Sequence, residues 1–425
     1  MTKAAAEQVL PKALVQTIGK SAGARNFTWY TLNKQVDQEL QYAPKADVKG
    51  GVFPANAIKV KAQSDGDVRT LTHPREQFNY RVSIAALQPD TAYAYRVGNE
   101  KTGWSPVYDF KTAKFTGDYS FLFFGDAQVG ASSSLEEDKK GWIDTLNVGM
   151  AKYPNTELLF SGGDQVESAP NEDEYDAFLA PEQLRSLPLV PIIGNHDVWS
   201  KAFENHFTLP GLDKNYGGGC ATYGGCRPGD TDFSSGNYYF EYKDTLFVIL
   251  NSNANSPKDI AEHTAFLEKA SQAHPNAKWK VVGFHHSIYS AATHAIDAGD
   301  TPIIEAMRGG KYNVEKMKDA SLTNAISKFG YDFVLMGHDH NYTRTFLLNK
   351  DGQKSNPAEK EGQTEITAKQ GDVLYITGNS SSGSKFYSKK LRPAGDNESK
   401  GRDGKLLPVA PYASVINQET LRNYT

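Results

Sequence analysis

Short runs of β-branched and aromatic residues alternate with polar turns over the first 115 residues. Three such runs cover residues 26–31, 78–84 and 92–97, and turn-forming residues such as Gln88-Pro-Asp90 lie between them. Runs of this length and composition are typical of β-strands. Because several short strands occur here without a helical pattern, the sequence predicts an all-β sandwich for residues 1–115.

From residue 116 onward, apolar runs alternate with segments of helical periodicity. The run 121–124 is the first predicted strand, and residues 135–153 then carry a hydrophobic stripe at helical spacing. The stripe consists of Trp142, Ile143, Leu146 and Met150. The next predicted strands are 158–160, 189–193, 246–250, 279–284, 333–336 and 373–376, and the next predicted helices are 172–187, 260–273 and 314–329. This alternation predicts an α/β domain over residues 116–425, in which helices flank β-sheets.

Composition and charge limit the class of protein. Forty-six Lys and Arg residues against fifty Asp and Glu residues give a net charge of −4, without the basic surplus of a nucleic-acid-binding protein. We therefore expect no nucleic-acid platform. No apolar run approaches the roughly 18 residues of a membrane-spanning helix, so no transmembrane segment is predicted. Ser, Gly, Lys and Asp dominate residues 380–405, which predicts a long surface loop. The oligomeric state stays open.

The expected compartment depends on the N-terminus and on two cysteines. The first residues lack the apolar stretch of a signal peptide, and Met1 is compatible with a cleaved signal that has been replaced. Cys220 and Cys226 are the only cysteines, and a disulfide between them would indicate an oxidising compartment, with two free thiols as the alternative. We expect a secreted, periplasmic or cell-surface protein whose signal peptide is absent from this chain.

Asp, Asn and His residues follow five of the predicted strands at the point where each strand ends. They lie in the turns Gly125-Asp126, Gly163-Asp164, Gly194-Asn195-His196-Asp197, His285-His286 and Gly337-His338-Asp339-His340. One Asp after a strand is more often a helix cap, but ligands bind at the carboxyl ends of strands in open α/β sheets. We therefore expect the five turns to converge in one crevice. Carboxylate and imidazole ligands without cysteine favour Mn, Fe or Zn and exclude an iron–sulfur site.

The same five blocks, in the same order, resemble the signature of calcineurin-like metallophosphoesterases. With the predicted β-sandwich in front, the chain is similar to the purple acid phosphatase branch of that family. Residues 87–97 resemble the tyrosine-bearing turn and strand of fibronectin type III modules. The resemblance covers residues 26–383. It implies two domains: a fibronectin III-like sandwich over residues 1–115, followed by an α/β metallophosphoesterase sandwich over residues 116–425.

The resemblance also implies a site for two divalent metal ions that share Asp164. The first ion would be bound by Asp126, Asp164 and His340, and the second by Asp164, Asn195, His285 and His338. His196 would face the substrate phosphate or the departing oxygen, so Asn195 and His196 are both expected to contact substrate. His294 stands nine residues after His285, where plant-type members carry a substrate-binding histidine; a solvated loop residue is the alternative.

Two positions depart from the purple acid phosphatase pattern. Gln128 stands where the purple enzymes have Gly, and Glu167 stands where they have a metal-ligating Tyr. Many other metallophosphoesterases place a His at the position of Gln128, so Gln128 is expected to give its amide oxygen to the first metal. Glu167 either ligates through water or orients a neighbour. Without the tyrosinate that compensates a ferric ion, a pair of divalent Mn, Fe or Zn ions is expected.

These residues together imply an enzyme that hydrolyses small phosphomonoesters. In the implied reaction a hydroxide bridging the two metals attacks in line with the leaving group. Asp164, as the shared ligand, and His196, as the proton donor, are the expected catalytic residues. A phosphodiesterase or nucleotidase with the same site is the first alternative, because the blocks do not distinguish these substrates. A non-catalytic adhesive or scaffold protein is the second, and the intact set of blocks argues against it.

Overall fold

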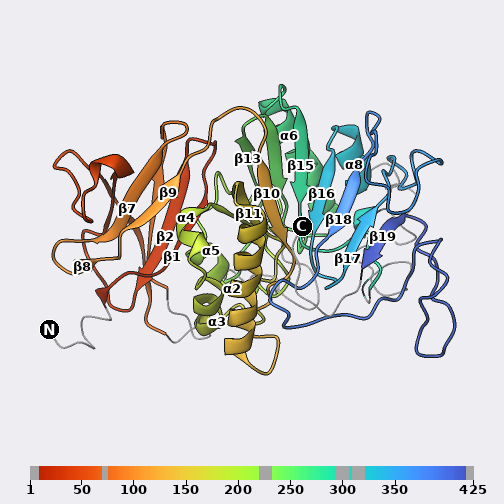
Figure 1. Cartoon of the computed structure of the whole chain (residues 1–425), viewed down its shortest axis with the longest axis horizontal. Coiled ribbons are helices and arrows are strands. Elements are labelled where there is room, and N and C mark those ends of the chain that lie inside the picture. The colour runs from red at the N-terminus through yellow and green to blue at the C-terminus, as the bar shows by residue number, and fades with distance from the viewer. Residues whose placement is uncertain are drawn as a thin grey trace.

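The computed structural model describes residues 9–68, 75–219, 232–292, 294, 306–308 and 321–417. Strands from the first hundred residues form one end of the elongated molecule, and strands β16 to β19 lie toward the other end (Figure 1). The predicted pairing of Cys220 with Cys226 lies outside the described residues. Among the described residues, no helix combines the length and the hydropathy that a membrane span requires.

The N-terminal part is an all-β sandwich. Its elements are β1 (Lys12–Ile18), β2 (Arg25–Thr31), β3 (Glu39–Pro44), η1 (Lys45–Asp47), β4 (Ile58–Lys61), β5 (Gln63–Asp67), β6 (Phe78–Ile84), β7 (Ala92–Asn99), β8 (Gly103–Trp104) and β9 (Tyr108–Lys111). Buried rings such as Phe27, Tyr95 and Phe110 fill the space between the layer β1-β2-β6-β5 and the layer of β3, β4, β7, β8 and β9. The Tyr93 hydroxyl accepts a hydrogen bond from the Gln88 backbone N–H (2.9 Å), which is the tyrosine-corner contact of immunoglobulin-like sandwiches.

The second part consists of two facing sheets with helices on their outer faces. Its elements before β13 are β10 (Ser120–Phe124), α2 (Leu135–Lys152), β11 (Thr156–Ser161), α3 (Glu172–Phe178), α4 (Gln183–Ser186), β12 (Leu189–Pro191) and α5 (Ala202–His206). The remaining elements are β13 (Tyr238–Tyr242), β14 (Thr245–Ile249), α6 (Pro257–Ala273), β15 (Trp279–Gly283), α8 (Leu322–Lys328), β16 (Phe333–Met336), β17 (Tyr342–Thr345), β18 (Leu374–Thr377) and β19 (Ala413–Asn417). Strands β10, β11 and β12 are parallel, and so are β14, β15, β16 and β18.

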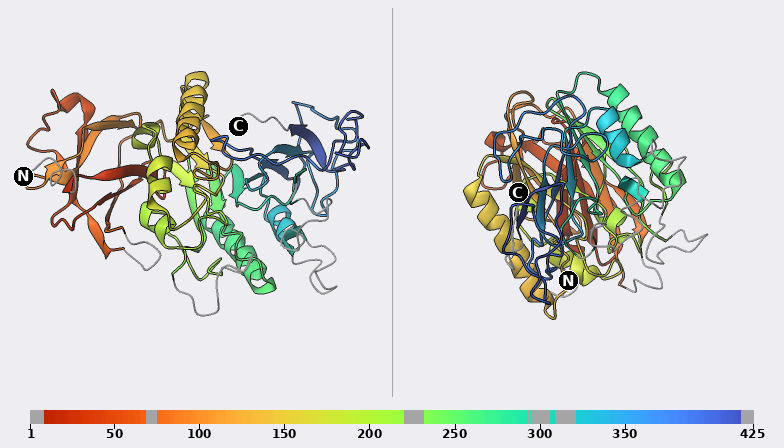
Figure 2. Two further views of the ribbon diagram at one scale, coloured as in Figure 1. Left: turned by 90° about the horizontal axis from the view of Figure 1, so that it is seen from below. Right: turned by 90° about the vertical axis from the view of Figure 1, so that its right-hand side faces the viewer.

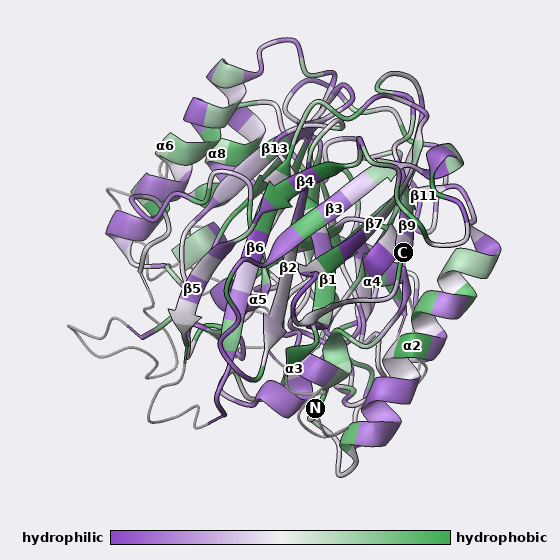
Figure 3. Cartoon of the chain, turned by 90° about the vertical axis from the view of Figure 1, so that its left-hand side faces the viewer, coloured by the Kyte–Doolittle hydropathy of each residue, from purple (hydrophilic) through white to green (hydrophobic). Residues whose placement is uncertain are grey.

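Apolar side chains hold the two sheets and their helices together. Phe160 and Ile192 of the first sheet pack with Phe247 and Leu335 of the second. Helices α2 and α6 lie on opposite sides of the paired sheets (Figure 2), and both carry hydrophilic as well as hydrophobic residues (Figure 3). A β-sandwich followed by an α/β domain is the predicted fold class, and the structure confirms it.

Helix α2 begins and packs as its sequence predicts. The Ser134 side chain accepts a hydrogen bond from the Glu137 backbone N–H, and three acidic residues occupy the first turn, which favours the positive end of the helix dipole. Trp142 and Leu146 of the predicted stripe are buried against the first sheet. Trp142 stacks on Phe178 (ring centroids 5.4 Å apart) and donates its indole N–H to the Phe178 carbonyl (2.9 Å).

Trp142 is therefore the residue of α2 whose loss should cost most stability. Trp142→Ala removes a side chain with 0% exposure, leaving a cavity and an unpaired carbonyl. We expect it to lower the free energy of unfolding by about 3–5 kcal/mol in urea denaturation. Trp279→Ala is the matched control, because Trp279 is 51% exposed and should lose less than half as much. Equal losses for the two variants would contradict this account of the core.

The two parts share one sheet. Strand β1 pairs in parallel with β12 through Thr17 and Leu189, so the seven strands run in the order β10-β11-β12-β1-β2-β6-β5. The Tyr30 hydroxyl also donates to Asp176 of α3 (2.7 Å). The domain boundary between residues 115 and 116 stays a prediction. The backbone pairing of β1 with β12 joins the segments on either side of that boundary.

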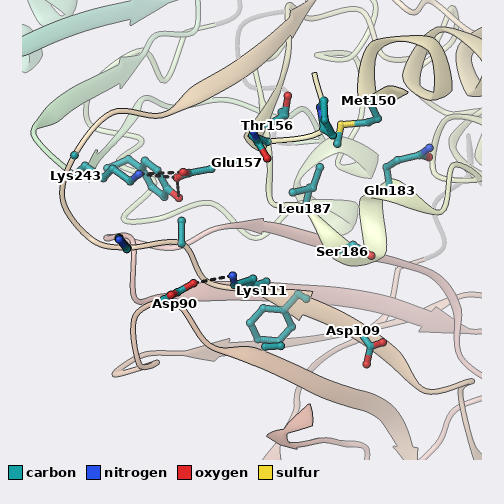
Figure 4. Close-up of a pocket in the computed structure, with 18 of the residues that line it drawn as sticks. Asp90, Asp109, Lys111, Met150, Thr156, Glu157, Gln183, Ser186, Leu187 and Lys243 are labelled. Atoms are coloured by element: carbon teal, nitrogen blue, oxygen red, sulfur yellow. Dashed lines mark hydrogen bonds and ion pairs between the residues drawn. The ribbon is translucent and has the colours of Figure 1, made fainter. Parts of the chain in front are cut away.

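A groove of about 980 Å³ lies between the two parts. Its charged side chains largely pair with one another: Lys111 with Asp90 (2.7 Å) and Lys243 with Glu157 (3.0 Å), as Figure 4 shows. Glu157 belongs to the beginning of β11. The groove is therefore at the opposite end of this strand from the turn that carries Asp164.

Candidate metal centre

The five polar turns meet between the two sheets, at the carboxyl ends of their strands. Each turn follows one strand directly: Asp126 follows β10, Asp164 follows β11, Asn195 and His196 follow β12, His285 follows β15, and His338 and His340 follow β16. The first three strands belong to one sheet and the last two to the other. The expected convergence in one crevice is therefore what the structure shows.

One group of predicted ligands surrounds His285. Its Nε2 lies 3.2 Å from Asp164 Oδ2 and 3.0 Å from Asn195 Oδ1. His338 Nδ1 lies 3.2 Å from the same nitrogen. The ligand atoms of Asp164, His285 and His338 are close enough to hold one metal ion. These four residues are the ones expected at the second metal position.

The predicted ligands of the first metal position lie beside this group. His340 Nε2 is 3.2 Å from Asp126 Oδ2, and both side chains are buried. The other Asp126 oxygen, Oδ1, accepts a hydrogen bond from the His338 backbone N–H (2.7 Å). Asp126 thus connects the turn after β10 with the turn after β16, which belongs to the other sheet.

Buried polar atoms without partners show that these residues fit a metal centre. Asp126 Oδ2 and Gln128 Oε1 are buried and make no hydrogen bond in the described part of the chain. Such atoms are rare in folded proteins, and a bound ion is one way to satisfy them. Carboxylate, amide and imidazole donors together suit Mn, Fe or Zn.

The glycines of the blocks are required by the close approach of these turns. A Cβ atom on Gly194 would lie 2.1 Å from Asp164 Oδ1, and one on Gly337 would lie 2.3 Å from Asp126 Oδ1. Either side chain would therefore displace a predicted ligand. The Gly-Asn-His and Gly-His-x-His blocks thus have a steric basis.

The backbone of the site is strained. Nine non-glycine residues of the described chain have positive φ, and four of them belong to these turns: Gln128 (36°), Asp164 (48°), His338 (74°) and His340 (42°). Such conformations are uncommon for residues with side chains and cluster at functional sites. The fold therefore tolerates strain to aim these side chains at one point.

Electrostatics favour a cation between the carboxylates and imidazoles. Burial opposes ionisation of Asp164, but the neighbouring His285 and His196 outweigh it and hold the pKa of Asp164 below its usual range. Burial likewise opposes protonation of His285, yet Asp164 and Asp126 raise the pKa of His285 to about 10. The site attracts positive charge, and a metal ion would take the place of the proton.

His196 differs from the predicted ligands because its ring reaches the opening of the site. Its backbone N–H donates to Asp164 Oδ1 (2.8 Å), and its Nδ1 lies 2.6 Å from the Glu167 carbonyl oxygen. A carbonyl only accepts, so Nδ1 carries the hydrogen. Nε2 is then the ring nitrogen left for another partner. The side chain is 28% exposed.

Gln128 and Glu167 form a pair. The Gln128 amide nitrogen donates to Glu167 Oε2 (2.6 Å), while the amide oxygen Oε1 has no partner in the described part of the chain. The amide nitrogen is thus held by Glu167 and the oxygen is left for a metal. The arrangement favours Gln128 as a ligand and Glu167 as the residue that orients it.

A cavity of about 190 Å³ opens over the cluster. In the described part of the chain it is lined by Asp164, Asn195, His196, His294, His338, His340 and Tyr387. His294 is half-buried, and its Nδ1 lies 2.8 Å from Asp339 Oδ1. The structure therefore places His294 in the cavity wall instead of in a solvated loop.

Tyr387 and the serines before it were missed by the sequence analysis. The prediction of a surface loop over 380–405 is wrong at its start, because Ser380–Ser382 are buried. Ser381 donates from its backbone N–H to the Asp126 carbonyl (3.0 Å) and from its hydroxyl to the Gly125 carbonyl (2.9 Å). The polar run directly after β18 follows the same strand-end rule as the five blocks. That signal could have identified it.

A second missed segment follows β14. The Ser252 hydroxyl lies 2.8 Å from His286 Nδ1, and the Asn253 side chain donates to the Gly194 carbonyl (3.2 Å). These contacts connect the turn after β14 with the turns that carry His285 and Asn195. Ser252 and Asn253 therefore support the site without lining the cavity.

Two family models match the chain. The model of the purple acid phosphatase N-terminal domain matches residues 11–112, and the model of the calcineurin-like phosphoesterases matches residues 119–342. The chain belongs to the calcineurin-like phosphoesterase family. Within it, the N-terminal match gives the purple acid phosphatase type, which confirms the resemblance seen in the five blocks. Metallophosphoesterases of this type use a dinuclear metal centre, and this chain has Asp and His groups that could hold metal.

Two known proteins illustrate the similarity. The curated protein "Probable inactive purple acid phosphatase 1" of Arabidopsis thaliana is 25% identical over an alignment of 326 positions, which covers 70% of this chain and 49% of that protein. The chain thus spans about half the length of this relative. The solved structure of purple acid phosphatase PPD1 from yellow lupin (Lupinus luteus) seeds matches with a TM-score of 0.67 at 15% identity, over 96% of this chain and 68% of that chain. At that identity it shows a shared fold.

Proposed function

We propose that this chain is a metal-dependent phosphomonoesterase. The observation that carries the proposal is the cluster of buried, partnerless ligand atoms beneath a cavity that His196 also lines. The first metal would be held by Asp126, Gln128, Asp164 and His340, and the second by Asp164, Asn195, His285 and His338. Two divalent ions bound there supply Lewis-acid stabilisation of the phosphoryl oxygens.

The protein's own groups supply positioning and a proton. Because Nδ1 of His196 is held by the Glu167 carbonyl, its Nε2 is the atom that can hydrogen-bond a substrate oxygen. We assign His196 the role of proton donor to the departing oxygen, which a phosphoryl transfer site needs when the leaving group is basic. Asn195 and His294 are assigned to substrate contact beside it.

The cavity over the cluster has room for a phosphoryl group: it measures about 190 Å³ and is lined by seven residues of the described chain. A phosphodiesterase or nucleotidase using the same cluster is the second candidate. The Arabidopsis relative carries the words "probable inactive" in its name, and that name concerns a longer protein, of which the match covers 49%. In this chain the complete cluster supports activity and argues against a purely adhesive role.

Metal content and turnover, measured on the same preparation, test the proposal. We expect about two equivalents of Mn, Fe or Zn per chain and faster hydrolysis of a mono-aryl phosphate than of the matching bis-aryl phosphate. Faster hydrolysis of the bis-aryl ester would favour the phosphodiesterase. Two equivalents of metal with no turnover of either ester would leave the adhesive or scaffold role.

The purified, metal-loaded protein should be colourless. The colour of the purple enzymes comes from a tyrosinate bound to ferric iron, and Glu167 stands at the matching position, hydrogen-bonded to Gln128. An absorption spectrum of the iron-loaded protein checks this expectation. A strong visible charge-transfer band would contradict it and would implicate Tyr387, the tyrosine of the cavity wall. Tyr387→Phe would then have to abolish the band.

We also propose that the protein functions outside the cytoplasm. The proposal rests on the two cysteines, whose spacing suits a small-loop disulfide. Mass spectrometry of alkylated, unreduced protein tests it, because a disulfide blocks modification of Cys220 and Cys226.

A further inference from the structure

The residue between the two histidines of the last block has no part in the metal cluster described above. Asp339 is 0% exposed, and it lies between His338 and His340, whose side chains face the predicted metals. Its Oδ1 lies 2.8 Å from His294 Nδ1. Its Oδ2 is buried without a hydrogen-bond partner in the described part of the chain.

Burial of a carboxylate destabilises the folded state unless the charge is paired. The imidazole of His294 is the side chain paired with Asp339 at hydrogen-bond distance. A carboxylate can only accept, so Nδ1 of His294 carries the hydrogen, and the same ring lines the cavity. The His294 ring also packs against the rings of His338 and Tyr387, with centroids 4.5 and 5.3 Å away.

We propose that Asp339 is a positioning residue that orients His294 toward a phosphate bound in the cavity. The inference rests on the proposed function and adds to it the residue that fixes one wall of the substrate site. Asp339 selects the tautomer of His294 and the ring orientation, and the two neighbouring rings hold the plane. Asp339 itself does not line the cavity.

A third cation is the competing explanation, because ligand atoms of His294, His338 and Asp339 lie within 4.8 Å of one another. His338 argues against it. Its Nδ1 already faces His285, 3.2 Å from Nε2, in the group expected to hold the second metal. A neutral imidazole has one acceptor nitrogen, so a metal on Nδ1 leaves Nε2 protonated and unable to bind another cation.

Phosphate binding to the metal-loaded protein tests the proposal independently of turnover. Isothermal titration with inorganic phosphate is carried out on wild type, Asp339→Ala, His294→Ala and the double variant. Each single variant should weaken phosphate binding about tenfold, the loss expected for one hydrogen bond to a charged group. Because both changes remove the same contact, the double variant should bind no more weakly than His294→Ala. Two equivalents of metal should remain in every variant.

Two further variants make the result decisive. Asp339→Asn keeps an oxygen that can accept from His294 and should lose less affinity than Asp339→Ala, which also covers the case in which the alanine variant folds poorly. Asp372→Ala removes a buried carboxylate that accepts from the Lys369 backbone N–H (2.8 Å), and it should leave phosphate binding unchanged.

Three outcomes overturn the proposal. The first is an unchanged phosphate affinity in Asp339→Ala. The second is a double variant whose loss of phosphate affinity equals the product of the two single losses. The third is a third equivalent of metal in wild type that disappears in Asp339→Ala. Wild-type protein that binds phosphate but hydrolyses no ester would refute the proposed function alone. The binding comparison would still decide the role of Asp339.

Discussion

Asp164→Ala should abolish retention of both metals and lower kcat/KM for a phosphomonoester on the order of 10³-fold or more, since each lost Lewis-acid contact removes several kcal/mol of transition-state stabilisation. Asp164 is the residue that both metal positions would share. Its Oδ2 lies 3.2 Å from His285 Nε2, and its Oδ1 accepts the backbone N–H of His196 (2.8 Å). Removal of the side chain therefore disturbs the ligands and the proton donor together.

Elemental analysis and turnover on the same sample measure the effect. Asp164→Asn keeps the shape and removes the charge, so it should lose metal as well if charge is what holds the ions. Asp372→Ala serves as the control for removal of a buried carboxylate elsewhere in the fold. Far-ultraviolet circular dichroism should show that all variants keep their β-rich structure. An active Asp164→Ala protein with two full equivalents of metal would refute the two-metal site.

His196→Ala should keep its metals and slow the hydrolysis of alkyl phosphates by roughly 10²–10⁴-fold, the usual value of general acid catalysis. Activated aryl phosphates should lose much less, because a stable aryl oxide departs without a proton. The hydrogen bond from Nδ1 to the Glu167 carbonyl leaves Nε2 as the nitrogen that can deliver that proton.

A series of leaving groups, measured on wild type and His196→Ala, decides the role. The slope of log kcat/KM against leaving-group pKa should become steeper in the variant. Parallel slopes would reject the acid role and leave His196 as a residue that orients phosphate. Gln183→Ala is a control in the groove between the two parts, since Gln183 lines that groove, its side chain bonds Asn147, and its loss should change neither slope.

The site blocks could be predicted from sequence because each of them is local. A buried parallel strand such as β11 ends in a turn, and a glycine there lets the next residue, Asp164, point back across the sheet edge. The strand, the glycine and the ligand are neighbours in the chain, so one short sequence pattern predicts all three. His294 is predicted from its position nine residues after His285, and the structure places it in the cavity wall.

The parts that escaped prediction depend on contacts between distant segments. Tyr387 reaches the cavity because Ser381 bonds the turn that carries Asp126, more than 250 residues earlier in the chain. Asp339 looks like a spacer in the Gly-His-x-His pattern, and only its pairing with His294 shows that it has a partner. The pairing of β1 with β12 likewise cannot be predicted from the local pattern, because the sequence of neither strand specifies its pairing partner.

That last pairing has a consequence for how such proteins change over evolutionary time. The family models divide the chain between residues 112 and 119, as if a front module had been added to an enzyme. The sheet continues across that division, because β12 of the second part pairs with β1 of the first. A lineage that lost the front module would expose β12 as an open edge, and open edges invite aggregation unless they are covered. A chain without the sandwich would therefore need a substitute strand or another cover along β12.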